Sequence, residues 1–460
     1  MTLMPYDDEA PAAGAATGGR VATGAIRGFP EFLPEEQATF ERFLAAVRTQ
    51  FSNAGAVSIV TPLVERIPVL LAKAGGAVTK EMYGLRRLSE SDDGSARDLG
   101  LKFDLTVPLA RYVSQHHHDL TMPFRRFSID RVHRGERPKS GRYREFWQAD
   151  FDIVGRGELA IATDAEPPAV IHRIFSETKT GPFVIRISNR KILNGFLHQL
   201  GLDESQQRKA LAVIDKFNGG HDEVARELSA KLPCDGSTAE EIVRFVSMPV
   251  DIDDPGRSLA SFRSNEIIAL GIDELVEVVR TALSLGVSPK NLKVDLSVVR
   301  GLDYYTGTVY ETTLLDYPNL GSVCSGGRYD DLASNFSTQK FPGVGISIGV
   351  SRLVTRLIEA GILPKTGAFS RHVLATRSDD SSEQYRLGIV DRLRSAGVPT
   401  EAFFERSDLG TQLKYADKKG FGFAVILKPG STRTIELRDL TLRQQHPVSE
   451  DELLARLVTS

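Results

Sequence analysis

Cysteine is scarce in this chain of 460 residues, which holds Cys234 and Cys324 too far apart to form a CxxC metal pair. So few thiols are typical of a protein that folds in a reducing compartment without structural disulfides. No apolar run reaches the length of a transmembrane helix. Neither a P-loop nor a Rossmann glycine pattern follows a predicted strand, which argues against two common nucleotide-binding folds. The consecutive histidines at residues 116–118 lack the spacing of metal ligands, so we expect no metal site.

A strong positive charge is also missing, because the formal net charge at pH 7 is -3. Any contact with nucleic acid must then come from local basic patches. Hydrophobic residues make up 41% and charged residues 25%, which is typical of soluble globular proteins, and the length predicts two or three domains. Residues 1–25 are rich in alanine and glycine and begin with acidic residues, unlike a signal or transit peptide. We therefore predict a disordered tail and a cytoplasmic protein without a membrane segment.

Hydrophobic spacing predicts a mixture of helices and strands. Residues 34–51 carry apolar side chains at helical spacing behind a proline that suits the first turn. Strands are predicted at residues 57–63, 101–108, 294–299 and 308–315, and a long hairpin at residues 124–155. Between about residues 200 and 285 the pattern is helical, with Thr238 and Glu241 as a capping box. After a linker near residues 364–370, alternating strand and helix patterns predict a small α/β domain.

Polar side chains crowd one face of the predicted hairpin, where period-two spacing aligns Arg142, Arg144, Phe146, Gln148 and Asp152. Guanidinium groups bind phosphate through paired hydrogen bonds, an aromatic ring stacks on a base, and a carboxylate accepts from a cation or an imidazole N–H. The row therefore favours a site for a nucleotide and a small polar substrate. A surface strand with solvated arginines fits the hairpin alone equally well.

Two further segments combine charged groups with hydroxyls. In LKFDLTVPLAR (residues 101–111) the carboxylate of Asp104 and the hydroxyl of Thr106 suit an ammonium group, although an aspartate at a cap or in an edge strand is the simpler interpretation. In RGLDYYTGTVYE (residues 300–311) Arg300 lies near Tyr304 and Tyr305, although a tyrosine pair more often belongs to a core. Neither segment alone identifies a site.

Glycine marks two more segments. In CSGGRYDDLA (residues 324–333) a paired-glycine turn precedes Tyr329, and we expect Cys324 to be a small buried residue rather than a nucleophile. GVGISIGVSRL (residues 343–353) predicts a strand with glycine on one face, followed by Arg352 at the start of a helix. A helix start beside an arginine is a ready phosphate site. Glycines that allow close packing of helix on strand are the alternative.

Taken in this order, the five segments resemble the histidyl-tRNA synthetases, which are class II aminoacyl-tRNA synthetases. VTPLVERIPVL (residues 60–70) is similar to class II motif 1, the hairpin to motif 2, and GVGISIGVSRL to motif 3. RGLDYYTGTVYE and CSGGRYDDLA resemble the two signatures specific to the histidine enzymes. The resemblance implies an α+β catalytic domain at residues 26–365, with a six-stranded antiparallel sheet, flanking helices and a helical insertion near residues 200–285. It also implies an anticodon-binding α/β domain at residues 371–460.

The same resemblance implies ATP-dependent ligation of L-histidine to histidine tRNA through a histidyl-adenylate, by a cytoplasmic homodimer that uses Mg²⁺. The ATP-binding residues of the family correspond to Arg134, Arg142, Phe146 and Arg352. Arg300 and Arg134 correspond to catalytic residues near the α-phosphate. The histidine-binding residues correspond to Asp104, Thr106, Gln148, Asp152, Arg300, Tyr304, Tyr305 and Tyr329. Asp104 and Asp152 stand where many bacterial members carry glutamate, which shortens the reach of the carboxylate.

Two other functions are associated with domains of this kind. One is a regulatory subunit of ATP phosphoribosyltransferase, which would bind histidine without charging tRNA. Such subunits usually lack the C-terminal domain and depart from the ATP-binding arginines, whereas Arg134, Arg300 and Arg352 are all present here. The other is a tRNA-sensing regulator of a kinase, and this chain carries no kinase signature. The sequence therefore favours the enzyme.

Overall fold

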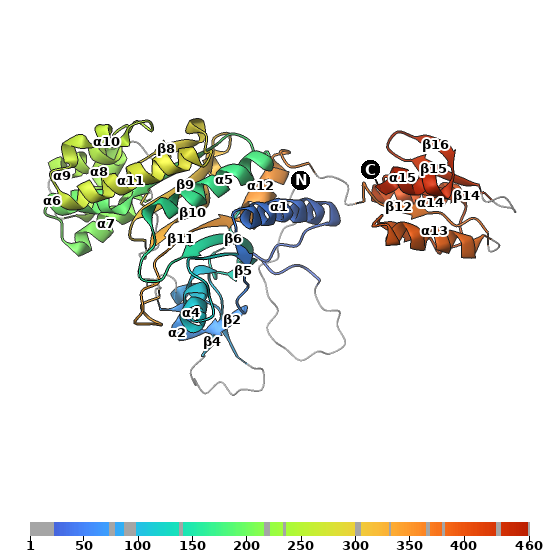
Figure 1. Cartoon of the computed structure of the whole chain (residues 1–460), viewed down its shortest axis with the longest axis horizontal. Helices are drawn as coiled ribbons and strands as arrows, with labels where there is room; N and C mark the ends of the chain where they lie inside the picture. The colour runs from blue at the N-terminus through green and yellow to red at the C-terminus, as the bar shows by residue number, and fades with distance from the viewer. Residues whose placement is uncertain are drawn as a thin grey trace. The chain divides into compact units, whose positions relative to one another are not determined.

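The computed structural model describes residues 23–72, 79–86, 98–137, 141–215, 221–232, 236–299, 305–330, 333–364, 369–379, 382–428 and 434–458. Most of the tail predicted at residues 1–25 lies outside these ranges. The chain forms two compact units, with Phe43–Leu363 making up most of the first and Pro364–Ser460 most of the second (Figure 1). None of the described helices is long and apolar enough to cross a membrane.

A sheet of eight strands is the centre of the first unit, in the order β1-β5-β6-β11-β10-β9-β7-β8. Its strands are β1 (Val57–Ser58), β5 (Phe124–His133), β6 (Glu145–Val154), β7 (Phe183–Asn189), β8 (Leu292–Val294), β9 (Thr308–Leu314), β10 (Ser322–Tyr329) and β11 (Gly343–Gly349). The six strands from β5 to β7 are antiparallel to their neighbours, and β1 and β8 join the two edges in parallel. The predicted six-stranded antiparallel sheet is confirmed, with one short parallel strand added at each edge.

The predicted hairpin is confirmed as β5 and β6, which pair without interruption from Phe124↔Val154 to His133↔Glu145. The odd-numbered residues Ala149, Phe151 and Ile153 of β6 are fully buried. Phe151 stacks on Phe51 of helix α1 (Pro34–Asn53), with 5.6 Å between ring centroids. One face of the hairpin thus belongs to the hydrophobic core, and the even-numbered residues of β6 face the other way.

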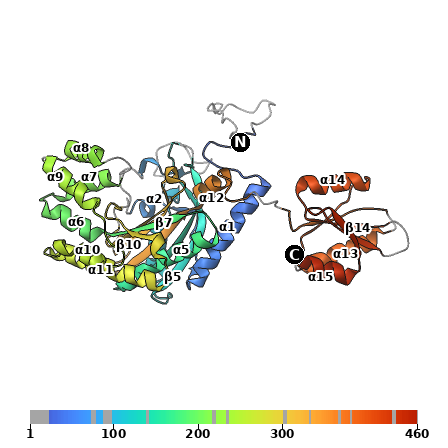
Figure 2. The same ribbon diagram turned by 90° about the horizontal axis from the view of Figure 1, so that it is seen from above.

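Helices cover the core side of the sheet, where α1, α5 (Glu166–Glu177) and α11 (Glu266–Ser284) lie side by side (Figure 1, Figure 2). Pro34 and the acidic residues that follow it suit the positive N-terminal end of α1, as predicted. Helix α12 (Val350–Glu359) continues directly from β11 and contacts β6. Short 3₁₀ helices, η1 (Ile161–Ala165), η3 (Pro289–Asn291) and η4 (Pro318–Leu320), connect these elements.

The insertion predicted near residues 200–285 contains α7 (Glu204–Ile214), α8 (His221–Lys231), α9 (Gly236–Val246), α10 (Pro255–Ser258), η2 (Ala260–Phe262) and α11, and helix α6 (Arg190–Gln199) leads into it. Asp203 and Gln206 form a capping box at the start of α7. The capping box predicted at Thr238 is wrong, because α9 already begins at Gly236 and Thr238 lies inside it. Its serine and threonine residues continue the helix instead of starting it.

A small three-stranded sheet, β2-β4-β3, lies beside the main sheet and contains β2 (Val64–Arg66), β3 (Gly84–Leu85) and β4 (Leu99–Leu101), with the short helix α2 (Ile67–Leu70). The strand predicted at residues 101–108 is wrong beyond Leu101. Strand β4 ends at Leu101, and helix α4 (Thr106–His116) begins at Thr106. Asp104 accepts a hydrogen bond from the backbone N–H of Val107 at 3.0 Å and so caps this helix. Pro108 fits its first turn.

Two other strand predictions are too long. The strand predicted at residues 57–63 is reduced to β1, Val57–Ser58. The strand predicted at residues 294–299 is misplaced as well, because β8 covers Leu292–Val294 and shares only Val294 with the prediction. After β8, Asp295 accepts from the backbone N–H of Ser297 at 3.1 Å and turns the chain.

The second unit has a five-stranded sheet in the order β13-β12-β14-β15-β16. Its elements are β12 (Val373–Ala375), α13 (Glu383–Ser395), β13 (Thr400–Ala402), α14 (Leu409–Lys419), β14 (Phe423–Leu427), β15 (Ile435–Asp439), β16 (Gln444–Val448) and α15 (Glu450–Val458). Strand β12 runs parallel to both β13 and β14, as the βαβ pattern predicts. Asp408 caps the start of α14, and Gly420 ends it with φ +76°.

Candidate active site

A cavity of about 1260 Å³ lies over the face of the main sheet that carries the even-numbered residues of β6. Every predicted site residue that the structure describes lines it: Asp104, Thr106, Arg134, Arg142, Phe146, Gln148, Asp152, Tyr305, Tyr329 and Arg352. Arg300 and Tyr304 lie outside the described residues. The fold thus brings five separate segments of sequence to one site. Arg144 does not share the row, because β6 begins only at Glu145 and the Arg144 side chain donates to the carbonyl oxygen of Glu136 at 3.3 Å.

Three arginines, Arg134, Arg142 and Arg352, form what we call the basic wall of the cavity. The Arg134 guanidinium lies over the rings of Phe103 and Phe146, 4.5 and 5.2 Å from their centroids. It also donates to the carbonyl oxygen of Phe103 at 3.3 Å, so its direction is fixed before any ligand arrives.

The other two members of the basic wall lie close enough to repel each other. Burial, together with the charges of Arg142 and Arg356, lowers the pKa of the Arg352 guanidinium. Arg142 is largely exposed and is 3.1 Å from Glu136. A cluster of cations held this way favours a polyanionic ligand such as a nucleotide triphosphate.

A buried acid, Asp152, forms the opposite kind of environment. Its carboxylate is 2.9 Å from the Arg126 guanidinium and accepts from the Tyr329 hydroxyl at 2.9 Å. Burial raises the pKa of Asp152, and the charge of Arg126 opposes that rise. The same guanidinium donates to the carbonyl oxygen of Leu105 at 2.9 Å, which ties the Asp104 turn to β6. Arg126 is an organising residue that the sequence prediction missed, since a lone arginine in a buried strand carries no motif.

Glycine creates the space in front of Asp152. Gly345 of β11 is paired with Asp152 across the sheet, and a Cβ atom on Gly345 would stand 2.2 Å from the Asp152 carboxylate. On the next strand Gly327 is paired with Gly345, and a Cβ there would stand 2.9 Å from the Tyr305 ring. These glycines leave room for a small planar group over the sheet.

Gly345→Ala is expected to weaken binding of the substrate that contacts Asp152 by about 10- to 100-fold, because the added methyl group overpacks the space. Calorimetric titration with L-histidine would measure the loss. Gly388→Ala in helix α13 is the control, since a Cβ there meets no atom within 4 Å and Gly388 does not line the cavity. Equal losses in the two variants would contradict the assignment of the space in front of Asp152.

A row of polar side chains crosses the floor of the cavity one step from the glycines. Successive cross-strand partners Asp150, Ser347, Ser325, Glu311 and Arg186 come from β6, β11, β10, β9 and β7, and all five line the cavity. The sequence prediction missed this polar row. Asp150 has the same period-two spacing as Gln148 and Asp152, so the spacing was a sufficient signal for that residue.

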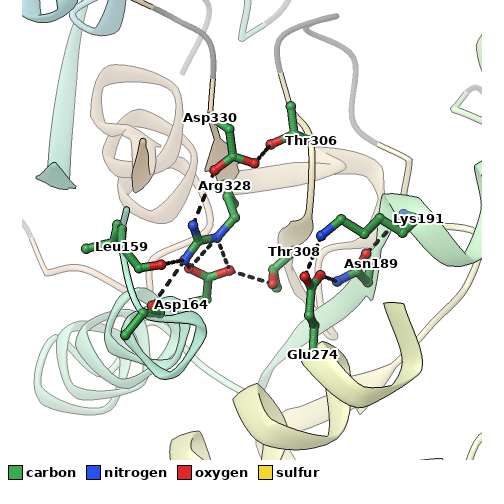
Figure 3. A network of polar contacts seen from close by, with 10 residues as sticks. Leu159, Asp164, Asn189, Lys191, Glu274, Thr306, Thr308, Arg328 and Asp330 are labelled. Carbon is green, nitrogen blue, oxygen red and sulfur yellow. Dashed lines mark hydrogen bonds and ion pairs between the residues drawn. The ribbon is translucent and has the colours of Figure 1, made fainter. Parts of the chain in front are cut away.

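Behind Tyr329 a buried ion pair fixes the strands that carry the site (Figure 3). Arg328 of β10 lies 2.9 Å from the Asp164 carboxylate and donates to the carbonyl oxygens of Leu159 and Ala160 at 3.0 and 3.1 Å. Asp164 also accepts from the Thr308 hydroxyl at 2.7 Å. Burial raises the pKa of Asp164 to about 6, although Arg328 opposes the rise.

The same cluster reaches the segment that begins at Tyr305 (Figure 3). The Thr306 hydroxyl donates to Asp330 at 2.5 Å, and its backbone N–H donates to the carbonyl oxygen of Arg328 at 2.9 Å. The fold thus holds Tyr305 and Tyr329, which both line the cavity, through one set of contacts.

A second buried contact joins β7 to α11. Glu274 accepts from the Asn189 amide at 2.8 Å and forms an ion pair with Lys191 (Figure 3). Asn189 at the same time caps α6 by accepting from the backbone N–H of Lys191 at 3.0 Å. These contacts anchor the base of the helical insertion to the sheet.

Among the described residues, none is evidently suited to metal binding or to thiol chemistry. Within the described ranges, no three His, Cys, Asp or Glu side chains gather as metal ligands. Cys324 is buried, as predicted, and burial raises the pKa of its thiol, which keeps it protonated.

Comparison with known proteins gives a consistent result. Residues 28–353 match the profile described as histidyl-tRNA synthetase, and residues 362–459 match the anticodon binding domain. A histidine–tRNA ligase of Stenotrophomonas maltophilia is 41% identical over 443 residues, covering 93% of this chain and 96% of that protein. The crystal structure of histidyl-tRNA synthetase from Nostoc sp. has a TM-score of 0.86 at 38% identity, over 95% of this chain and 99% of that one.

A more distant structure shares the fold alone. It is described as an ATP phosphoribosyltransferase regulatory subunit/histidyl-tRNA synthetase from Bacillus halodurans, with a TM-score of 0.70 at 19% identity. At this identity the likeness does not distinguish between the two functions in its description.

The antiparallel sheet, the motif 2 hairpin and the arginine that follows β11 define the catalytic domain of a class II aminoacyl-tRNA synthetase. With a family profile covering residues 28–353 and relatives of about 40% identity along most of its length, the chain belongs to the histidyl-tRNA synthetase family.

Proposed function

We propose that this enzyme activates L-histidine with ATP and transfers the histidyl group to histidine tRNA. The observation that carries the proposal is a single cavity that combines the basic wall with the buried acid Asp152. The first environment suits the phosphates of ATP, and the second suits a neutral ring that donates an N–H. A C-terminal unit that matches an anticodon-binding profile favours a tRNA substrate.

The basic wall is assigned to ATP. Arg142 and Arg352 would hold the outer phosphates, and Phe146 would offer its ring to adenine. Arg134 would face the α-phosphate, where negative charge develops as the histidine carboxylate attacks and pyrophosphate leaves. Arg300 is assigned the same role from the other side of that phosphate, and its side chain lies outside the described residues.

Histidine is assigned to the end of the cavity that contains Asp152. There Asp152 would accept the imidazole N–H, with Tyr305 and Tyr329 beside the ring, and Tyr304 is assigned to the same pocket. Asp104, Thr106 and Gln148 would hold the α-amino group. Since the Asp152 acceptor is buried, an isosteric amino acid without the N–H would leave it unpaired at a cost of about 1–3 kcal/mol.

Positioning supplies most of the rate in this proposal. Both reactants carry negative charge, so fixed guanidinium groups reduce their repulsion and orient the attack on the α-phosphorus. The second step joins the histidyl carbonyl carbon to a terminal ribose hydroxyl of the tRNA and releases AMP. Neither step requires a nucleophilic side chain of the protein.

Magnesium is proposed to arrive with ATP. The described residues hold no cluster of metal ligands, so the phosphate oxygens and water would supply most of its ligands. The ion would neutralise the outer phosphates when bound. We also propose a homodimer, because residues 60–70 resemble class II motif 1, which supports the dimer interface in the family. The two cysteines of the chain fit the proposed location in the reducing cytoplasm.

Histidine-dependent exchange of pyrophosphate into ATP tests the first step, and charging of histidine tRNA tests the second. The proposal expects both activities. Histidine binding without exchange would instead support the noncatalytic regulatory subunit. Exchange without charging would contradict the assignment of tRNA as the acceptor.

A further inference from the structure

The polar row on the cavity floor contains groups that the roles proposed above do not use. The amide nitrogen of Gln148 donates to the Ser347 hydroxyl at 3.0 Å. Ser347 is also the direct partner of Asp150 across β6 and β11, and its hydroxyl lowers the pKa of the Asp150 carboxyl group. Because the Ser347 hydroxyl accepts from the Gln148 amide, its own proton can be donated to the Asp150 carboxylate. Ser347 therefore fixes the orientation of both neighbours.

Two acceptors remain without a partner in this arrangement. The amide oxygen Oε1 of Gln148 and the carboxylate oxygen Oδ1 of Asp150 are both buried and make no hydrogen bond to any described group. The Gln148 residue is 8% exposed and Asp150 is 2% exposed, and both line the cavity. Buried acceptors of this kind are costly unless a donor fills the site.

The charge around Asp150 favours a cationic donor. Three carboxylates, those of Asp104, Asp150 and Asp152, line the cavity. Arg134 and Arg126 both act on Asp104, whereas Arg126 is the cation that acts on Asp150. Arg126 is already engaged by Asp152 at 2.9 Å. Further along the row, the Arg186 guanidinium is engaged by Glu311 at 3.1 Å. The carboxylate without a cation of its own is therefore Asp150.

We propose that Asp150 is a specificity-determining residue that binds the α-ammonium group of the amino acid substrate together with Oε1 of Gln148. Ser347 is the positioning residue that turns the Gln148 oxygen toward the cavity. The inference rests on the proposed function and adds to it a second carboxylate, beside Asp104, for the amino group.

The spacing of β6 supports the ammonium over the imidazole as the ligand of Asp150. Side chains two residues apart on a strand are separated by about 7 Å. An imidazole in the glycine-lined space at Asp152 thus places the amino end of histidine over the next cross-strand row, which contains Asp150 and Ser347. The polar row therefore lies two residues along each strand from Gly345 and Gly327.

The ionisation of Asp150 is compatible with this role. Burial raises its pKa to about 7; Arg126 opposes the rise, and Asp152 and Asp104 add to it. The Asp150 carboxyl group is therefore readily ionised near neutral pH. An approaching ammonium group favours its charged form.

The Asp150→Asn variant tests the proposal with L-histidine and two analogues, each of which lacks one group of L-histidine. Calorimetry would compare L-histidine, histidinol, which keeps the ammonium group but lacks the carboxylate, and imidazolepropionate, which lacks the ammonium group. The variant is expected to bind histidine and histidinol about 10- to 100-fold more weakly, as for the loss of a charged hydrogen bond. Its affinity for imidazolepropionate should stay within about twofold, since that ligand makes no contact with Asp150.

Matched variants separate recognition from general damage. Asp273→Asn removes a surface carboxylate of α11 that is 64% exposed, and it should leave all three affinities unchanged. Asp150→Ser removes the charge with a different shape and should show the same ligand pattern as Asp150→Asn. Ser347→Ala should weaken histidine binding less than Asp150→Asn does, and should likewise spare imidazolepropionate.

Equal weakening of all three ligands by Asp150→Asn, or no weakening of any, would overturn the assignment. Failure of the role assigned to Asp150 can be distinguished from failure of the proposed function. If the wild-type protein binds histidinol but gives no histidine-dependent exchange, the proposed reaction fails, while the comparison of the three ligands still decides the role of Asp150.

Discussion

Arg134→Ala is expected to lower the turnover of histidine-dependent pyrophosphate exchange by about 100- to 1000-fold, the usual effect of removing one donor to a developing oxyanion. The guanidinium is already oriented by the Phe103 carbonyl oxygen and by the rings of Phe103 and Phe146. A group fixed in this way stabilises the transition state without reorganising during the reaction. The loss should therefore appear in kcat rather than in the affinity for histidine.

Two further variants define the cause of that loss. Arg134→Lys keeps the charge but loses the planar fork, so it should recover only part of the activity. Arg131→Ala is the matched control on β5, because that side chain is 52% exposed and does not line the cavity. An Arg134→Ala protein that retains full turnover would refute the role assigned to this residue.

Arg328→Met is expected to lower the free energy of unfolding of the first unit by about 3–5 kcal/mol, because it leaves the Asp164 carboxylate buried without its partner. Denaturant titration followed by a probe in that unit would measure the change. The affinity for histidine should fall as well, since Arg328 precedes Tyr329 and its backbone carbonyl oxygen accepts from Thr306.

The pH dependence of this loss has a defined sign. Arg328 lowers the pKa of Asp164, which burial raises, so removing the guanidinium raises the pKa above about 6. A buried acid with a raised pKa takes up a proton on folding, and that uptake becomes less favourable as pH rises. The destabilisation should therefore be larger at pH 8 than at pH 5.

A double variant supplies the control for the buried pair. Arg328→Met combined with Asp164→Leu should regain much of the lost stability, because the only carboxylate left without Arg328 in this cluster, Asp330, is 43% exposed. Arg263→Met breaks a surface ion pair with Asp273 and should change the free energy of unfolding by less than about 1 kcal/mol. Equal effects of Arg328→Met and Arg263→Met would contradict the view that burial makes the Asp164 pair important.

The parts of the fold with strong periodicity could be predicted from sequence. The hairpin of β5 and β6, helix α1 and helix α14 follow their patterns closely, because each repeats its apolar spacing over several turns or residue pairs. The segment around Asp104 could not be predicted in the same way. Its apolar residues fit a strand and a helix equally, and a single capping hydrogen bond to Val107 decides the outcome.

The site was predictable where a residue type carries its own chemistry. The glycine-faced strand before it indicated Arg352, and the resemblance to motif 2 indicated Arg134, and both line the cavity. Arg126 and Ser347 act through partners on other strands, so their importance depends on a register that one sequence does not reveal. Asp150 is different, because it lies in the same period-two row as Gln148 and Asp152. Its place in the cavity could have been predicted from that spacing.

The two faces of strand β6 limit which changes of sequence the protein can tolerate there. Its odd-numbered residues, such as Phe151, fill the core against α1, and its even-numbered residues, such as Asp150, face the substrate cavity. A substitution alters one face and spares the other. The insertion or deletion of a single residue exchanges the two faces, so carboxylates would enter the core and aromatic rings the cavity. A single substitution in this strand therefore disturbs either the core or the cavity, whereas a change in its length disturbs both at once.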